Sequence, residues 1–241
     1  MKILSDDAIH SKFLLNLPVH IEGIGNFYAP MLTDIVDLTE EYYNMALSTV
    51  FFDKSKVEED LGEHSNFEVL LYIVNQDDYF RELFFYGITL HIDNSPLIHP
   101  TGAIFFGEFS QDSILTEEKL EYIKKLVRIA NNIPEPKPEE EYKAGNEMAR
   151  KLIEEIKKKR ERKNKVAKQS PINLHSMMSA VGWKAQSFEF ISKLTIYQLY
   201  DGFHRLRVID NYDHNIRGIY SGTVDASKIK LSEIDWANII K

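Results

Sequence analysis

The sequence predicts an α+β protein whose mixed N-terminal domain, built with β-hairpins, is joined by a proline-rich linker and a long basic helix to an all-α C-terminal module. Three observations predict this: an early glycine-centred hairpin pattern, a proline cluster mid-chain, and helical apolar spacing near the end. With 241 residues and 44% apolar content, the chain can bury a substantial core. The predicted boundaries are 1–131 for the domain, 132–142 for the linker, 143–169 for the basic helix and 170–241 for the helical module.

Residues 17–28 predict the first hairpin. Two short apolar runs flank Gly23-Ile24-Gly25, and glycines between such runs favour a tight turn. The same Gly-x-Gly could also belong to a phosphate-binding loop, but no third glycine follows at the required spacing and no clear helix opens there. The hairpin is therefore the favoured interpretation.

The rest of the N-terminal domain contains four strong helix starts. Capping residues stand before helical apolar patterns at Thr39, Ser65, Asp77 or Asp78, and Thr116. Two β-like runs, 88–92 and 103–109, are separated by a turn-rich stretch and predict a second antiparallel pair.

The middle of the chain is extended and then strongly basic. Prolines 134, 136 and 138 break both helices and sheets, which favours a spacer. Residues 143–168 carry 11 basic and 4 acidic residues, although the whole chain has a net charge of −8. We expect this helix to contact the acidic body or solvent. Nucleic-acid binding through Lys157, Lys158, Lys159 and Arg160 is the alternative, but no aromatic residues interleave with the run.

The C-terminal module is expected to contain four helices. Asn173 and Ser187 are candidate caps for two of them, and Thr195 with Gln198 forms a capping-box pattern at the start of a long third helix that ends near Gly222. Its apolar stripe either packs on its own domain or covers a partner. A short final helix from Ser232 is expected to bury Ile234 and Trp236.

No reaction chemistry is legible in the sequence. The chain has no cysteine, which fits a reducing compartment and removes thiol catalysis and disulfides. Its histidines lack metal-ligand spacing, and His204 with Asp201 is more often a local helix contact than a catalytic pair. There is no phosphate-loop motif, nucleophile elbow, signal peptide or membrane-spanning run. We therefore expect a cytosolic protein without enzymatic activity, cofactor or bound metal.

The last 70 residues contain a set of structural features at fixed places: Trp183, the run Leu194 to Leu199, Phe203 with Arg205, Asp210-Asn211-Tyr212, Gly222 and Asp235-Trp236. Upstream, Ala144-Gly145-Asn146-Glu147 and the early hairpin with Pro30 and Asp34-Ile35 belong to the same pattern. In these features the sequence resembles tail assembly chaperone-like proteins encoded in the tail gene clusters of phages and prophages of Gram-positive bacteria, most strongly over the last 70 residues.

The resemblance implies a chaperone or adaptor that binds and solubilises the phage tape measure protein in the host cytoplasm. It also implies self-association or contact with the tail tube protein. No membrane partner is expected, because no apolar run is long enough to span a bilayer. The expected partner-binding residues are Ile196, Tyr197, Tyr200, Phe203, Trp183 and Trp236. The alternative is a structural tail or baseplate subunit that stays in the virion. A third possibility is a nucleic-acid or regulatory adaptor that uses the basic helix.

Overall fold

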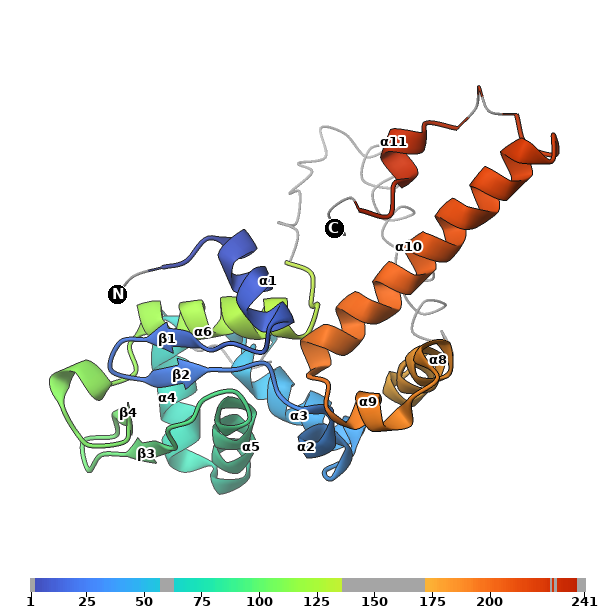
Figure 1. The fold of residues 1–241 in the computed structure, drawn as a ribbon. Helices are drawn as coiled ribbons and strands as arrows, with labels where there is room; N and C mark the ends of the chain where they lie inside the picture. Colours follow the sequence, from blue (N-terminus) through green and yellow to red (C-terminus); the bar gives the residue numbers. More distant parts are fainter. Residues whose placement is uncertain (1–2, 57–62, 136–171, 226, 228, 238–241) are drawn as a thin grey trace, which may run out of the picture.

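One long helix, α10 (Ile196–Tyr220), extends as an arm from a body of helices and two small hairpins (Figure 1). The computed structural model describes residues 3–56, 63–135, 172–225, 227 and 229–237. The α+β class predicted from the sequence is confirmed. The predicted basic helix and most of the predicted linker lie outside the described residues, and the division into domains stays a prediction.

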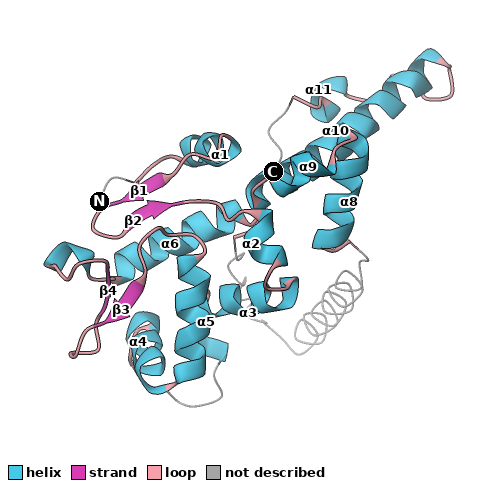
Figure 2. Cartoon of the chain, turned by 60° about the horizontal axis from the view of Figure 1, so that its bottom comes forward, coloured by secondary structure: helices cyan, strands magenta, loops and turns pink. Residues whose placement is uncertain are grey.

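The N-terminal part combines helices with two small hairpins (Figure 2). Its elements in chain order are α1 Asp6–Leu14, β1 Val19–Ile21, β2 Gly25–Phe27, α2 Leu32–Val36, α3 Glu40–Val50, η1 Lys54–Lys56, α4 Asn66–Gln76, α5 Asp78–Thr89, β3 Pro96–Ile98, β4 Ile104–Phe106, η2 Gln111–Ser113 and α6 Glu117–Ala130. The described C-terminal elements are α8 Leu174–Ala185, α9 Phe188–Ser192, α10 Ile196–Tyr220 and α11 Leu231–Ile234.

The first hairpin forms as predicted. Strands β1 and β2 pair antiparallel, with Val19 opposite Phe27. The Asp93 carboxylate accepts hydrogen bonds from the backbone N–H of Asn26 at 2.8 Å and from its side-chain Nδ2 at 2.9 Å. At Gly23, where φ is +74°, an added Cβ would lie 1.7 Å from the carbonyl oxygen of Asp112. The turn therefore requires glycine for conformation and for space, and phosphate binding is not needed to explain it.

The strand predicted at residues 88–92 is wrong. Helix α5 continues through Thr89, and the strand that pairs with β4 is β3, which lies inside the stretch interpreted as a turn. Gly87 lies inside α5, where that helix crosses α3. A Cβ there would lie 2.7 Å from the carbonyl oxygen of Ala46. The glycine thus permits close helix packing and does not terminate the helix.

The root of the C-terminal part shares one hydrophobic core with the N-terminal part. Apolar residues of α8, α9 and the first turn of α10 belong to the same buried cluster as α1, α3 and α6. Backbone hydrogen bonds join the two parts, from Leu32 N–H to the Leu194 carbonyl at 3.0 Å and from Ile196 N–H to the Pro30 carbonyl at 2.8 Å. The Glu40 carboxylate accepts from the Leu174 N–H at the start of α8, at 3.3 Å. The start of α10 is therefore firmly seated.

Beyond its root, α10 forms an arm that we define as residues 200–220. The capping box of Thr195 and Gln198 is present, and Gly222, with φ of +74°, follows the helix end as predicted. No residue of the arm is fully buried. Helix α11 lies beside the arm (Figure 1). The expected burial of Trp236 is wrong: its side chain is 49% exposed, because α11 covers the arm with only one short turn.

A buried polar network joins α3 to the residues that follow α5 and α6 in the N-terminal core. The Tyr43 hydroxyl donates to Oδ1 of Asn131, whose Nδ2 donates to Nε2 of His91 at 3.3 Å. Nδ1 of His91 lies 2.8 Å from the Gly87 carbonyl oxygen, so this nitrogen carries the proton and the ring is neutral. Burial lowers the pKa of His91 from 6.5 to about 4, against the opposing effect of the Gly87 hydrogen bond.

Because His91 is buried and neutral, we expect the protein to lose stability in mild acid. Because its folded pKa lies below the unfolded value, the unfolded chain binds the extra proton between pH 6.5 and about 4. Above pH 6.5, His91 is neutral in both the folded and the unfolded chain and does not lower the free energy of unfolding. As the pH falls from 6.5 to about 4, the free energy of unfolding decreases by about 3 kcal/mol. Urea denaturation at pH 7 and at pH 4.5 measures the effect. In His91→Gln the pH-dependent difference should shrink relative to the parent; an unchanged difference would contradict a neutral buried His91.

Candidate interaction surfaces

Two of the six residues predicted to bind a partner lie at the root of α10. Ile196 is buried in the shared core and is not accessible in this conformation. The Tyr197 hydroxyl lies 2.9 Å from Nδ1 of His10, and its ring packs against Phe13 in α1. Burial, with a smaller effect of the Asp201 charge, raises the pKa of Tyr197 to about 12. Both side chains attach the helix to the body.

The next two predicted residues lie where the arm leaves the body. Tyr200 is half-buried, and burial together with the Glu40 charge raises its pKa. Phe203 is also half-buried, and the Arg207 guanidinium lies 5.8 Å from the centre of its ring. Asn132 Nδ2 and His204 Nε2 lie 3.1 Å apart, so α6 still reaches the helix at this level. These two side chains are partly available to a partner.

The two tryptophans are the most accessible of the six. Trp183 on α8 is 73% exposed and packs edge-to-face on Phe188, with ring centres 5.5 Å apart. The carbonyl of Trp236 accepts a hydrogen bond from Arg205 Nη1 at 2.6 Å, which ties the segment after α11 to the arm. The six predicted residues thus do not form one surface. Ile196 and Tyr197 attach α10 to the body, whereas the exposed tryptophans lie on separate elements.

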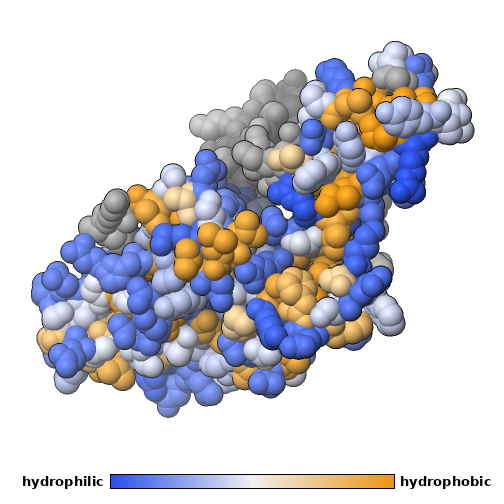
Figure 3. Space-filling view, in the orientation of Figure 1, coloured by the Kyte–Doolittle hydropathy of each residue, from blue (hydrophilic) through white to orange (hydrophobic). Residues whose placement is uncertain are grey.

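The apolar stripe predicted for α10 extends to Ile209, and apolar residues continue beyond it along the arm. Ile209, Tyr212, Ile216 and Ile219 recur at three- and four-residue steps and are all half-buried. Figure 3 shows apolar surface along the arm and α11, and a separate apolar patch over the end of α1. Near the tip, a Cβ at Gly218 would lie 2.6 Å from the Val224 side chain, so the chain after α10 folds back closely on the helix. By contrast, Gly202 has no atom within 4 Å of such a Cβ.

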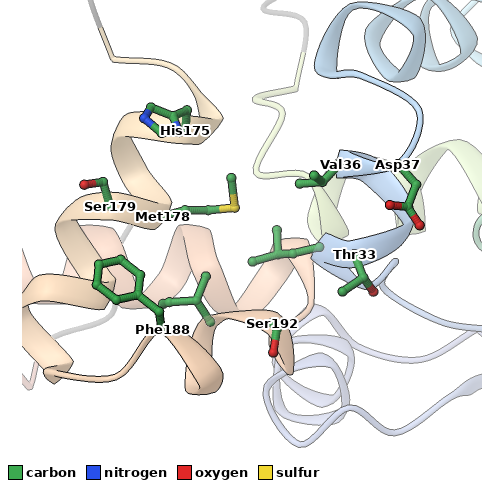
Figure 4. A pocket seen from close by; sticks show the side chains of 10 residues that line it. Thr33, Val36, Asp37, His175, Met178, Ser179, Phe188 and Ser192 are labelled. Carbon is green, nitrogen blue, oxygen red and sulfur yellow. The ribbon is translucent and has the colours of Figure 1, made fainter.

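A groove of about 390 Å³ opens between α2 on one side and α8 with α9 on the other. We call it the α2–α8 groove. Its apolar lining consists of Leu32 and Val36 from α2, Met178 from α8, and Phe188 and Ile191 from α9. Figure 4 shows Met178 extending from α8 towards Val36 across the opening.

The rim of the α2–α8 groove is polar and carries one formal charge. Thr33 and Asp37 stand on the α2 side, and His175, Ser179 and Ser192 stand on the other (Figure 4). A hollow lined by Glu40, Glu41 and Asn173 lies at the start of α8. A groove with an apolar floor and with hydrogen-bonding and acidic edges can bind a partner through apolar side chains that are flanked by polar ones.

The groove was not predicted from the sequence, although the sequence of α9 contains one signal for it. Helix α9 has only five residues, with apolar side chains at Phe188, Phe190 and Ile191. Residues two apart on a helix point to different sides, so a single core cannot cover all three. The structure buries Ile191 and leaves both phenylalanines about half exposed. The contribution of α2, more than 130 residues earlier, has no sequence signal.

The described residues provide no grouping of three or more histidine or acidic side chains suited to a metal ion. Within the same residues, every helix is too short or too polar to cross a membrane. Among the described residues, the arm and the α2–α8 groove are candidate surfaces for binding a partner.

A family model matches the part of the chain that contains the arm and one wall of the α2–α8 groove. Residues 161–241 match the family model described as the YomV second domain. This domain family is phage-derived, and the match, over about a third of the chain, suggests that the chain is phage-derived as well. No curated protein matches the chain, and neither does any solved structure. The region similar to the YomV second domain contains α8 to α11, and hence the arm and one wall of the α2–α8 groove.

Proposed function

We propose that this protein is a phage tail assembly chaperone or adaptor that binds the tape measure protein and keeps it soluble in the host cytoplasm. The observation that carries the proposal is the arm, a long helix that leaves the body with an apolar row along it and with no residue fully buried. The match to the phage-derived YomV second domain supports a role in a phage, and the resemblance to tail assembly chaperones supports the choice of partner.

The arm suits a partner that is itself a long helix. A tape measure protein exposes apolar helical stripes, and the row from Ile209 to Ile219 offers a matching stripe for side-by-side packing. The seated root holds the arm in place, which lowers the ordering cost of binding. The net charge of −8 keeps such a complex soluble. The proposed function is binding, without a catalytic step or cofactor. In this proposal the body, and not the arm, contacts the tail tube protein or a second copy of the chain.

A structural tail or baseplate subunit is the second candidate. The rigid root of α10 favours it, because a subunit fixed in a particle needs its contact surfaces held in place. Mass spectrometry of purified particles separates the two. A chaperone is abundant in the lysate of producing cells and absent from particles, whereas a subunit is present in particles at a fixed copy number.

Aspartates on the arm should weaken partner binding without unfolding the body. In the variant Ile209→Asp with Ile216→Asp, two charges interrupt the apolar row, and we expect co-purification of the tape measure protein to fall by about tenfold or more. Circular dichroism checks that the fold persists. The matched control is Asn211→Asp, which adds a charge at an exposed position of the same helix and should bind like the parent. Equal binding by all variants would exclude the arm as the binding surface.

A further inference from the structure

We infer that the α2–α8 groove is a docking site for an amphipathic helix of a partner protein that carries lysine or arginine beside its apolar face. The groove lies at the root of α10 and uses residues outside the arm, so the inference does not depend on the tape measure protein being the partner of the arm. It assigns a second surface and the chemistry of what that surface binds.

The floor of the groove requires an apolar occupant. Its five apolar side chains come from three helices, and two of them are more than half exposed on opposite walls, Val36 at 53% and Phe188 at 55%. The volume of about 390 Å³ accommodates a few apolar side chains from one face of a helix. An amphipathic helix laid between α2 and α8 would insert anchors at three- and four-residue steps.

The charges around the groove select a basic partner. Sequence positions 13–53 contain no lysine or arginine, so α2 and α3 contribute only acids to this face. Asp37 stands on the rim, and Glu40 and Glu41 line the hollow at the start of α8. Lys184 in α8 pairs with Asp210, and Lys193, which follows α9, pairs with Glu189, each at 2.7 Å. A partner with basic flanks gains attraction here, and an acidic one is repelled.

Trp183 provides a direct readout of occupation. It packs edge-to-face on Phe188, which lines the groove, so an occupant that moves or covers Phe188 alters the surroundings of the indole. The chain has two tryptophans, and the variant Trp236→Phe leaves Trp183 as the single emitter.

The test is a titration of the full-length Trp236→Phe chain with two synthetic amphipathic helical peptides. Both peptides have a leucine face; one has lysine flanks and the other glutamate flanks. We expect a saturable change in Trp183 emission with the lysine peptide, at least about tenfold weaker binding of the glutamate peptide, and weakening of the lysine peptide by added salt. The double variant Asp37→Lys with Glu41→Lys should reverse the preference between the peptides.

A matched pair of variants locates the site. Val36→Lys places a positive charge in the groove at an exposed position and should weaken the lysine peptide by about tenfold or more. Leu97→Lys makes the same kind of change at an exposed position on β3 and should leave binding unchanged. The inference is overturned if neither peptide binds, if both bind equally, or if Val36→Lys binds like the parent. It is also overturned if the groove is closed by a second copy, seen as a dimer that Val36→Lys dissociates.

Discussion

Replacing Leu199 with aspartate is expected to unfold both parts of the chain in one transition. Leu199 is fully buried in the cluster that joins the first turn of α10 to the N-terminal core. An unpaired charge at this position, together with the lost leucine packing, costs roughly 4 kcal/mol or more. This is a large share of the stability of about 5–15 kcal/mol typical of natural proteins. Urea denaturation followed by circular dichroism measures the loss.

The control for this prediction lies in the same helix. Tyr220 is 87% exposed at the end of the arm, so Tyr220→Asp should change stability by less than about 0.5 kcal/mol. If the N-terminal part of Leu199→Asp keeps its cooperative transition while only the C-terminal part unfolds, the two parts do not share a core in solution.

The two helical glycines at positions 87 and 202 should respond to alanine in opposite directions. At Gly87 the added Cβ would lie 2.7 Å from the Ala46 carbonyl oxygen and 3.0 Å from Val50 Cγ2, so α3 and α5 must separate. We expect Gly87→Ala to destabilise the protein by about 2 kcal/mol. Nothing lies within 4 Å of a Cβ at Gly202, and Gly202→Ala should stabilise α10 by up to about 1 kcal/mol through helix propensity.

Thermal denaturation of the two alanine variants beside the parent measures both effects. The comparison is informative because the substitution is chemically identical and both sites are in helices. Destabilisation by Gly202→Ala would mean that another surface packs against the start of the arm. A neutral Gly87→Ala would mean that α3 and α5 cross less closely than the structure shows.

Helix starts were predictable because their signals are local. The capping boxes at Ser65 with Glu68, Asn173 with Ser176, and Thr195 with Gln198 each involve residues three apart, and all begin helices in the structure. The run Ile88–Ile92 misled because apolar, β-branched residues suit a strand or a buried helix end equally. Its conformation is decided by the packing of α5 on α3, which is a tertiary effect.

The candidate surfaces were predictable only in part. The arm stripe follows from helical spacing, but the burial of Ile196 and the exposure of Trp183 depend on where α1 and α2 pack. The α2–α8 groove brings Val36 together with Met178 and Phe188, which are far apart in sequence. No local pattern encodes such a juxtaposition, so the groove required the folded chain.

The most direct measurement of the proposed function is co-expression with the longest helical protein encoded nearby, which the proposal expects to be the tape measure protein, followed by size-exclusion chromatography of the soluble fraction. If the protein is a chaperone, the tape measure protein becomes soluble and co-elutes with many copies of this chain. Many copies are expected because each one covers only the stretch of helix that one arm reaches. If the tape measure protein stays insoluble, or the two proteins elute separately, the proposed function is wrong.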